Sequence, residues 1–309
     1  MNYQTTLFDT SNSLIVSTLD VSPDGRWLVV GQQGDDTTQI ALGVWSMESK
    51  ALEDVLIRSE YDIPLAARFS PDSKLLAFSD MNQDLTIKDL ASGASDQHSF
   101  SLRFTKWLSF AWNCNRLIAG GSRTQVWDPD LRTVVFTLPV EPLPDKPSIT
   151  PPCCALSPDG QHVAASGIEP GRILIYEVTR GEVVSRIENT MDDARSMAFD
   201  PSGRFLAATA RLGGAGLWNV ETGEAVLPDL LNMRADYYWC VRFHPNGEHV
   251  GFGLWSGFVN VIRIADGDYA VTQDKPIHQG RVNDIAFTRN GKHMVTGGDD
   301  GVVLVWELR

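Results

Sequence analysis

The feature that most constrains this chain is a four-residue turn that recurs seven times along its 309 residues. The spacings from one turn to the next are 48, 42, 45, 43, 44 and 44 residues. Most copies carry proline, which fixes φ, and asparagine or aspartate followed by glycine, which tolerate the conformation that reverses a chain between two strands. The chain therefore contains seven copies of one structural unit. The turns occupy residues 22–25, 70–73, 112–115, 157–160, 200–203, 244–247 and 288–291.

Each turn is flanked by segments with the pattern of β-strands. Residues one and three positions before the turn are mostly apolar, as Phe243 and Val241 are before the sixth turn. An apolar run follows each turn, so the two segments form a hairpin. A third strand with a large side chain at a fixed place and a fourth, outer strand such as 183–187 complete the unit. The large residues are Trp45, Trp127, Tyr176, Trp218, Ile262 and Trp306, and Lys88 stands at this place in the second unit.

A single four-stranded sheet cannot bury both of its faces, whereas seven sheets arranged radially cover one another. The sequence therefore predicts an all-β fold, a seven-bladed β-propeller with four antiparallel strands per blade and one domain over 1–309. The last unit ends on its third strand, 302–308. We predict that the N-terminal segment 3–8 supplies the missing outer strand and joins the last blade, which removes two exposed sheet edges.

The last unit carries a recognisable set of polar and aromatic residues. His278, Thr296, Asp300 and Trp306 surround its hairpin, and Asp284 lies in its first strand. In this pattern the chain resembles the WD-repeat family, whose members build seven-bladed propellers. The resemblance implies that His278, Thr296, Asp300 and Trp306 form a buried hydrogen-bonded set, and that the face around the central channel binds proteins. The other six units lack the histidine, and three of them lack the tryptophan.

Few residues are candidates for chemistry. His162, His249 and His293 each fall five residues after the start of their own turn, so they lie on three different blades and are too far apart to share a metal ion. His278 with Asp284 or Asp300 and a nearby Ser or Thr is similar to a hydrolase set, but the hydrogen-bonded set that the WD-repeat resemblance implies needs the same residue types. We therefore predict no enzyme, no metal site and no cofactor. A propeller hydrolase or lactonase with its site at the mouth of the central channel is the alternative.

Charge and cysteine content narrow the choice of partners. The chain has 39 acidic and 26 basic residues, a net charge of −13, which repels phosphate backbones and anionic lipid headgroups. We expect no nucleic-acid partner and no membrane. The first 14 residues lack the pattern of a signal peptide, and no run of 18 apolar residues occurs. The four cysteines fit neither a disulfide framework nor a zinc site, so we expect a soluble, cytoplasmic protein.

Two kinds of loop meet at one rim of a propeller: those that enter the inner strands, and those between the second and third strands. Fixed offsets from the turns assign residues to this rim. They predict a protein-binding surface rich in tryptophan, tyrosine and arginine, the residues that dominate the energetics of interfaces. The candidates are Trp107, Arg195, Arg211, Tyr237, Trp239, Trp255, Arg281, Asn283 and Asp299.

The arginines of blades five to seven, Arg195, Arg211 and Arg281, locally invert the sign of an acidic chain. We therefore expect other protein subunits or peptide segments as partners, with acidic groups and an apolar anchor. In the alternative interpretation, Trp239 packs between blades and the arginines pair with nearby carboxylates. The proline-rich segment from Pro139 to Pro152 is either a rigid loop or a docking ligand.

Overall fold

The computed structural model describes residues 3–8, 14–33, 40–58, 63–80, 85–98, 107–111, 113–120, 124–128, 133–139, 153–166, 168, 171–188, 194–210, 214–227, 237–271 and 275–308. Every regular element in these residues is a β-strand, which confirms the prediction of an all-β fold. Within these ranges, no helix has the length and apolar character needed to span a membrane.

The described strands form seven antiparallel sheets, which we number in chain order. Sheet 1 contains β2 (Ile15–Val21), β3 (Trp27–Gln33), β4 (Ile40–Ser46) and β5 (Leu52–Arg58). Sheet 2 contains β6 (Pro64–Phe69), β7 (Leu75–Asp80), β8 (Leu85–Asp89) and β9 (Ser95–His98). Sheet 3 contains β10 (Trp107–Phe110), β11 (Leu117–Gly120), β12 (Thr124–Asp128) and β13 (Thr133–Thr137).

The second half of the chain repeats this order. Sheet 4 contains β14 (Cys154–Leu156), β15 (His162–Ser166), β16 (Arg172–Glu177) and β17 (Val183–Glu188). Sheet 5 contains β18 (Ala194–Phe199), β19 (Phe205–Ala210) and β20 (Ala215–Asn219). Sheet 6 contains β21 (Tyr238–Phe243), β22 (His249–Leu254), β23 (Val259–Arg263) and β24 (Tyr269–Val271). Sheet 7 contains β25 (Val282–Phe287), β26 (His293–Gly298), β27 (Val303–Leu308) and β1 (Tyr3–Phe8).

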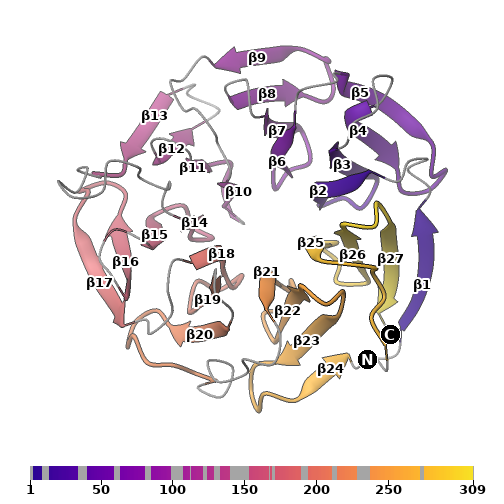
Figure 1. Cartoon of the computed structure of the whole chain (residues 1–309). Helices are drawn as coiled ribbons and strands as arrows, with labels where there is room; N and C mark the ends of the chain where they lie inside the picture. The colour runs from indigo at the N-terminus through magenta and orange to yellow at the C-terminus, as the bar shows by residue number, and fades with distance from the viewer. Residues whose placement is uncertain are drawn as a thin grey trace.

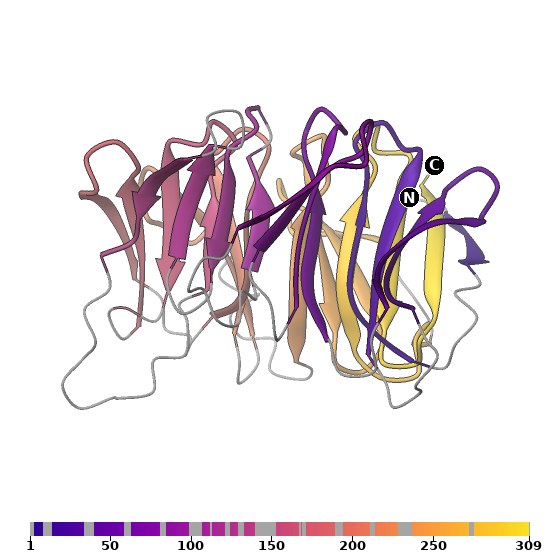
Figure 2. The same cartoon turned by 90° about the horizontal axis from the view of Figure 1, so that it is seen from above.

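The sheets are arranged like the blades of a propeller. Their first strands, such as β6 and β18, lie nearest the centre, and later strands lie progressively farther out (Figure 1). Seen edge-on, the strands run between the two faces of a disc (Figure 2). Six sheets have the predicted four strands. In sheet 5 the described residues form three, and a bridge between Trp218 and Ala225 begins a fourth beside β20.

The recurring turn forms as its residue types require. In the first copy, the Ser22 hydroxyl accepts a hydrogen bond from the backbone N–H of Trp27 at 2.9 Å and donates one to Asp24 at 2.6 Å. The last residue of the turn has a positive φ in six of the seven copies, for example 75° at Gly25. Glycine takes this left-handed conformation without steric cost. In the second copy Ser73 adopts it instead, at 61°.

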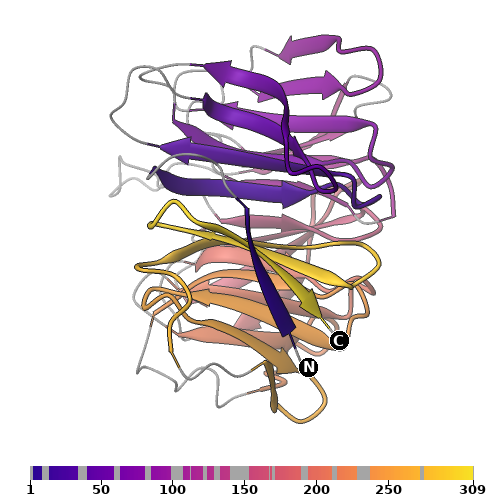
Figure 3. The same cartoon turned by 90° about the vertical axis from the view of Figure 1, so that its right-hand side faces the viewer.

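The N-terminal strand joins the C-terminal sheet, as predicted. Strand β1 pairs antiparallel with β27 over six residues, from Tyr3 opposite Leu308 to Phe8 opposite Val303. Figure 3 shows the two ends of the chain side by side. Sheet 7 is therefore assembled from both termini.

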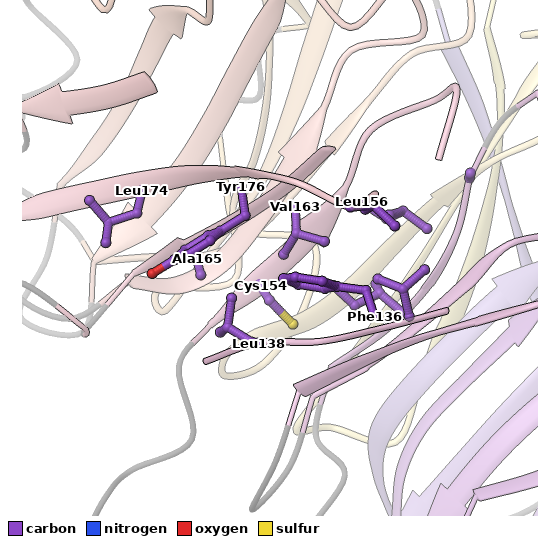
Figure 4. Close-up of a cluster of buried hydrophobic side chains, with 12 residues drawn as sticks. Phe136, Leu138, Cys154, Leu156, Val163, Ala165, Leu174 and Tyr176 are labelled. Atoms are coloured by element: carbon purple, nitrogen blue, oxygen red, sulfur yellow. The ribbon is translucent and has the colours of Figure 1, made fainter. Parts of the chain in front are cut away.

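Apolar clusters fill the spaces between neighbouring sheets. Among the described residues there are seven such clusters, and each draws its side chains from two adjacent sheets. Between sheets 3 and 4, for example, Phe136 and Leu138 pack against Val163 and Tyr176 (Figure 4). The cluster around Trp45 joins sheet 7 to sheet 1. Each large side chain buried in this way contributes about 1.5–3 kcal/mol to stability.

The second unit departs from this pattern at one place. The large residues at the fixed place of the third strand are buried, as Trp218 and Trp306 are. Sheet 2 has Lys88 there, and its ammonium group lies 2.5 Å from the carboxylate of Asp54 on the outer strand of sheet 1. An ion pair between sheets thus takes the place of aromatic packing.

Removing residues 1–8 deletes β1 and leaves β27 as an unpaired sheet edge. We expect this truncated protein to melt at least about 5 °C lower, and to self-associate because an exposed edge pairs with other chains. Thermal melting and size-exclusion chromatography measure the two effects. Removing only residues 1–2 is the control, since it leaves β1 complete. Equal melting temperatures for the two truncations would show that β1 contributes nothing to stability.

Candidate functional site

Four side chains of sheet 7 and its loops form one hydrogen-bonded set. His278 Nδ1 lies 3.0 Å from Asp300 Oδ1, and its Nε2 lies 2.9 Å from Thr296 Oγ1. The indole N–H of Trp306 donates to the same Thr296 oxygen at 3.1 Å. Burial acts to raise the pKa of Asp300, but hydrogen bonds from His278 and the backbone of Gln279 outweigh it and lower that pKa. All four side chains are thereby engaged in holding the loops of this sheet together.

In five sheets the inner strand contains a β-bulge, which changes the direction of one side chain. The register of each strand shifts at the residue five positions before its turn. A bulge leaves one residue unpaired and turns its side chain away from the regular alternation. All five bulge residues line the central cavity of the protein. They are Ser17, Leu65, Arg195, Trp239 and Asn283.

Five of the residues predicted for the binding rim lie in contact with one another. The Arg195 guanidinium stacks 3.3 Å above the ring of Trp239, and the Trp239 and Trp255 rings are 5.1 Å apart. The guanidinium of Arg281 lies 4.5 Å from the Trp239 ring and 4.8 Å from that of Trp255. Tyr237 meets Trp255 edge-on at 6.5 Å. We call these five residues the rim cluster.

The rim cluster includes two large side chains that face solvent. Tyr237 is 50% exposed and Trp255 is 49% exposed. The backbone N–H of Trp255 donates to the carbonyl of Tyr237 at 2.8 Å, which holds the two residues at the same end of sheet 6. Half-exposed aromatic side chains beside arginine are typical of surfaces that bind another protein.

The sequence predicted that three arginines locally invert the sign of the charge, but one of them, Arg281, does not contribute to such an inversion. Arg281 forms a bidentate ion pair with Asp299, at 2.7 Å and 3.0 Å, and Asn283 donates to the same carboxylate at 2.9 Å. Burial acts to raise the pKa of Asp299, but the hydrogen bonds from Arg281 and Asn283 outweigh it and lower that pKa. The alternative interpretation, an arginine paired with a nearby carboxylate, is therefore correct for Arg281.

Parts of the predicted surface lie outside the described residues. Arg211 is one of them, and so is the proline-rich segment from residue 140 to residue 152. Trp107 begins β10, but its side chain is not described. The role of the other candidates in binding stays a prediction.

The inner strands of all seven sheets line a central cavity of about 450 Å³. One repeat position contributes a residue from every sheet, namely the second residue before each turn. In sheets 4, 5 and 7 this residue is alanine, whereas in sheets 1, 2 and 6 it is charged. The seven residues are Asp20, Arg68, Phe110, Ala155, Ala198, Arg242 and Ala286.

A buried carboxylate links the charged residues of this cavity. Asp284 of sheet 7 pairs with Arg68 of sheet 2 and with Arg242 of sheet 6, each at 2.9 Å. It also accepts hydrogen bonds from Thr18 and from the backbone N–H of Leu19 in sheet 1. Desolvation acts to raise the pKa of Asp284, but the two guanidinium groups outweigh it and lower that pKa. One side chain thus connects four sheets.

Asp20 lies in the same cluster, but its pKa is shifted in the opposite direction to that of Asp284. Burial raises its pKa to about 6, and the neighbouring Arg68 and the hydrogen bond from the Phe69 N–H offset only part of this effect. We call Asp20, Arg68, Arg242 and Asp284 the channel cluster. None of them was among the predicted site residues. Their positions could have been found from the sequence, because along an inner strand residues that face neighbouring sheets alternate with residues that face the centre.

Comparison with known proteins agrees with the fold and the polar set. The family model "WD domain, G-beta repeat" matches residues 2–40 and 273–307. The second match contains the whole His278–Thr296–Asp300–Trp306 set. These two segments are therefore similar to the repeats of the WD-repeat family. The segments that match the family model are thus the two that meet in sheet 7.

Several curated proteins are similar to this chain over about half of its length. WD repeat-containing protein SL1-17 of Schistosoma mansoni is 21% identical over 147 residues, which cover 48% of this chain and 47% of that protein. Jouberin of Rattus norvegicus is 25% identical over 50% of this chain and 15% of its own length. Telomerase protein component 1 of Mus musculus is 28% identical over 44% of this chain and 5% of its own length. The matched regions therefore span less than half of each relative.

WD-repeat proteins are in general non-catalytic scaffolds. Within the described residues, no group of three or more His, Cys, Asp or Glu is arranged to hold a metal ion. His162, His249 and His293 begin β15, β22 and β26, so they lie in three different sheets. His278 and Asp300, which together suggested a hydrolase, contact each other. His278 also contacts Thr296, and Asp300 accepts a hydrogen bond from the backbone N–H of Gln279.

The hydrogen bonds around Thr296 predict how the loss of its hydroxyl affects stability. Thr296→Val removes the hydroxyl that contacts both the indole N–H of Trp306 and Nε2 of His278, two buried polar groups. We expect a loss of about 2–4 kcal/mol in the free energy of unfolding. Thr296→Ser keeps the hydroxyl and serves as the control. Urea unfolding measures both variants, and equal stabilities would contradict a role for the hydroxyl.

The raised pKa of Asp20 predicts a change in stability with pH. Because the folded protein binds this proton more tightly than the unfolded chain, stability falls as pH rises from about 4 to about 6. We expect Asp20→Asn to be more stable than the native protein by about 1–3 kcal/mol at pH 8, and little different at pH 4. Urea unfolding across this range measures the effect.

Asp24 provides the control of opposite sign. Burial acts to raise its pKa, but hydrogen bonds from Ser22 and Arg26 outweigh this and lower it. Asp24→Asn should therefore reduce stability at neutral pH. A loss of stability in Asp20→Asn at pH 8 would show that the Asp20 carboxylate is favourably placed after all.

Proposed function

We propose that this protein is a non-catalytic scaffold that holds other proteins, built as a closed seven-bladed β-propeller of one domain. Two observations support closure: the pairing of β1 with β27, and the apolar cluster shared by sheets 7 and 1. A closed ring has few exposed sheet edges, so it is rigid and presents its loops at fixed positions. The cysteines Cys114, Cys154 and Cys240 are not in disulfides, which favours a cytoplasmic location.

The observation that carries the proposal is the rim cluster. Tyr237 and Trp255 are half exposed, adjoin each other and lie beside two arginines. Trp239 is fixed beneath them by Arg195 and Arg281, so the surface is ordered before any partner arrives. An ordered aromatic surface loses little conformational entropy on binding. The rim cluster is thus suited to receive an apolar side chain of a partner.

The partner that fits this surface carries acidic groups beside its apolar anchor. The preference for acidic groups rests on the two arginines of the rim cluster, of which Arg281 also pairs with Asp299. One relative, Telomerase protein component 1, is by its name a component of a larger assembly. A scaffold role for this chain agrees with that description.

Trp255→Ala tests the rim cluster as the binding surface. We expect the amount of partner captured from native extract, identified by mass spectrometry, to fall at least about tenfold, because a central tryptophan at an interface often contributes 2 kcal/mol or more. Val184→Ala is the control, since Val184 is 53% exposed on the outer strand β17. Thermal melting verifies that both variants fold. Unchanged capture by a folded Trp255→Ala variant would reject the rim cluster.

A further inference from the structure

The lining of the central cavity changes in character along the inner strands. Seven and five positions before a turn, at the rim, sheets 1 and 2 present aliphatic side chains that are only partly buried, namely Ile15, Ile63 and Leu65. Two and four positions before the turn, deeper in the cavity, lies the channel cluster. The rim side of the cavity therefore has apolar side chains along its wall and an ionic floor.

A second apolar wall faces the first across the cavity. Trp239 has in sheet 6 the bulge position that Leu65 has in sheet 2, and the inner strands of these sheets, β21 and β6, lie on opposite sides of the centre (Figure 1). Leu108 of sheet 3 also lines the cavity. At the same bulge position, the polar groups of Ser17 and Asn283 both donate to backbone carbonyls of neighbouring sheets. Their hydrogen bonds are thus made within the protein.

The charges of the floor balance one another. Arg68 and Arg242 share the carboxylate of Asp284, and Asp20 is the second carboxylate of the same cluster. Burial raises the pKa of Asp20 to about 6, which shows that a charge at this depth loses much of its hydration. An additional ion of either sign would lose its own hydration and find no unmatched charge in return. The floor therefore disfavours a charged ligand.

The two charged residues of the described lining at the rim also interact with protein groups. The guanidinium of Arg195 stacks 3.3 Å above the ring of Trp239, and that of Arg281 pairs with Asp299 at 2.7 Å. Both arginines thereby hold Trp239 in place. The group that fits between the apolar walls is thus an uncharged one.

The size of the cavity suits a whole side chain. It encloses about 450 Å³, whereas an apolar cavity of about 150 Å³ in another protein binds benzene. Trp239 belongs to both the rim cluster and the cavity wall. A partner that contacts the exposed rings of Tyr237 and Trp255 therefore has the entrance of the cavity beside it.

We propose that the rim side of the central cavity is a pocket for one uncharged apolar side chain of the protein partner, next to the residue that rests on Tyr237 and Trp255. The proposal rests on the function proposed above and adds a second, buried anchor to it. Leu65, Leu108 and Trp239 form the walls of this pocket. Acidic groups of the partner stay outside it, where water hydrates them. Anchors of this kind contribute most when a preformed pocket excludes water around them.

Titrations with three small probes, followed by NMR of the full chain, test the chemistry of the pocket. Toluene reproduces the side chain of phenylalanine, whereas benzoate and benzylamine carry a negative and a positive charge on the same ring at neutral pH. We expect toluene to bind. The two ions should bind at least about tenfold more weakly, because each would lose hydration without gaining a partner.

A substitution taken from the repeat itself locates the probe. Leu65→Trp gives sheet 2 the residue that sheet 6 has at the same position, so it fills the pocket and should weaken toluene binding at least about tenfold. Leu52→Trp is the matched control, since Leu52 is 40% exposed on the outer strand β5. Trp255→Ala should leave toluene binding unchanged. Thermal melting checks the fold, and Leu65→Asp, which places a charge in the wall, is the second variant where Leu65→Trp does not fold.

Capture of the partner connects the pocket to the scaffold function. Leu65→Trp should lower the amount of partner captured from native extract at least about tenfold relative to Leu52→Trp. The rim cluster is tested separately by Trp255→Ala, so the two surfaces can fail independently. Loss of capture in Leu65→Trp but not in Trp255→Ala would reject the rim cluster and keep the pocket.

Three results would overturn the proposal. No binding of toluene, or equal binding of toluene and either ion, would show that the cavity does not select an uncharged apolar group. Toluene binding that Leu65→Trp and Leu65→Asp leave unchanged would place the probe elsewhere on the protein. A folded Leu65→Trp variant that loses toluene but captures the partner normally would show that the partner does not enter the cavity. In that last case the scaffold function stands and the inference about the pocket fails.

Discussion

The structure depends on one constraint, that each of its small sheets is apolar on both faces. A sheet of this kind is stable only when a neighbour covers each side. The large residues at the fixed place of the third strand meet this need, as Trp127 packs toward sheet 2 and Trp218 toward sheet 4. Repetition of the unit extends the same contact from sheet to sheet, and the pairing of β1 with β27 extends it across the two ends of the chain. Where the packing residue is Lys88, an ion pair with Asp54 substitutes for it.

The same alternation that covers the sheets also builds the cavity. Along an inner strand, Val241 and Phe243 face neighbouring sheets and are buried, so Arg242 between them faces the centre. The bulge then turns Trp239 and its equivalents toward the rim. Rim and cavity are thus two consequences of one strand geometry, and their side chains vary from sheet to sheet without disturbing the apolar packing. This freedom allows a repeat fold to carry a distinct site on each member.

Much of this could be predicted because it is periodic. The seven turns, the antiparallel strands and the N-terminal strand beside β27 follow from a pattern of local residue types. The contacts of Trp239 with Arg195 and Arg281 were also foreseeable, since fixed offsets from the turns place all three residues in loops at the same rim. The pairing of Arg281 with a nearby carboxylate was one of the two interpretations that the sequence left open. The link between Asp284 and Arg68 was not foreseeable, because Arg68 lies 216 positions away from Asp284 and no local pattern relates them.

The position of Asp284 explains why a cluster of buried charges is tolerated. A buried ion pair adds little net stability, since the cost of desolvation offsets the attraction, but breaking one costs about 3–5 kcal/mol. Asp284 lies in the sheet that is assembled from both chain ends, and its partners come from the sheets on either side of that joint. Its pairs therefore contribute most by fixing geometry. Asp284 thus fixes the guanidinium groups of Arg68 and Arg242 at the centre of the cavity, although the two arginines come from different sheets.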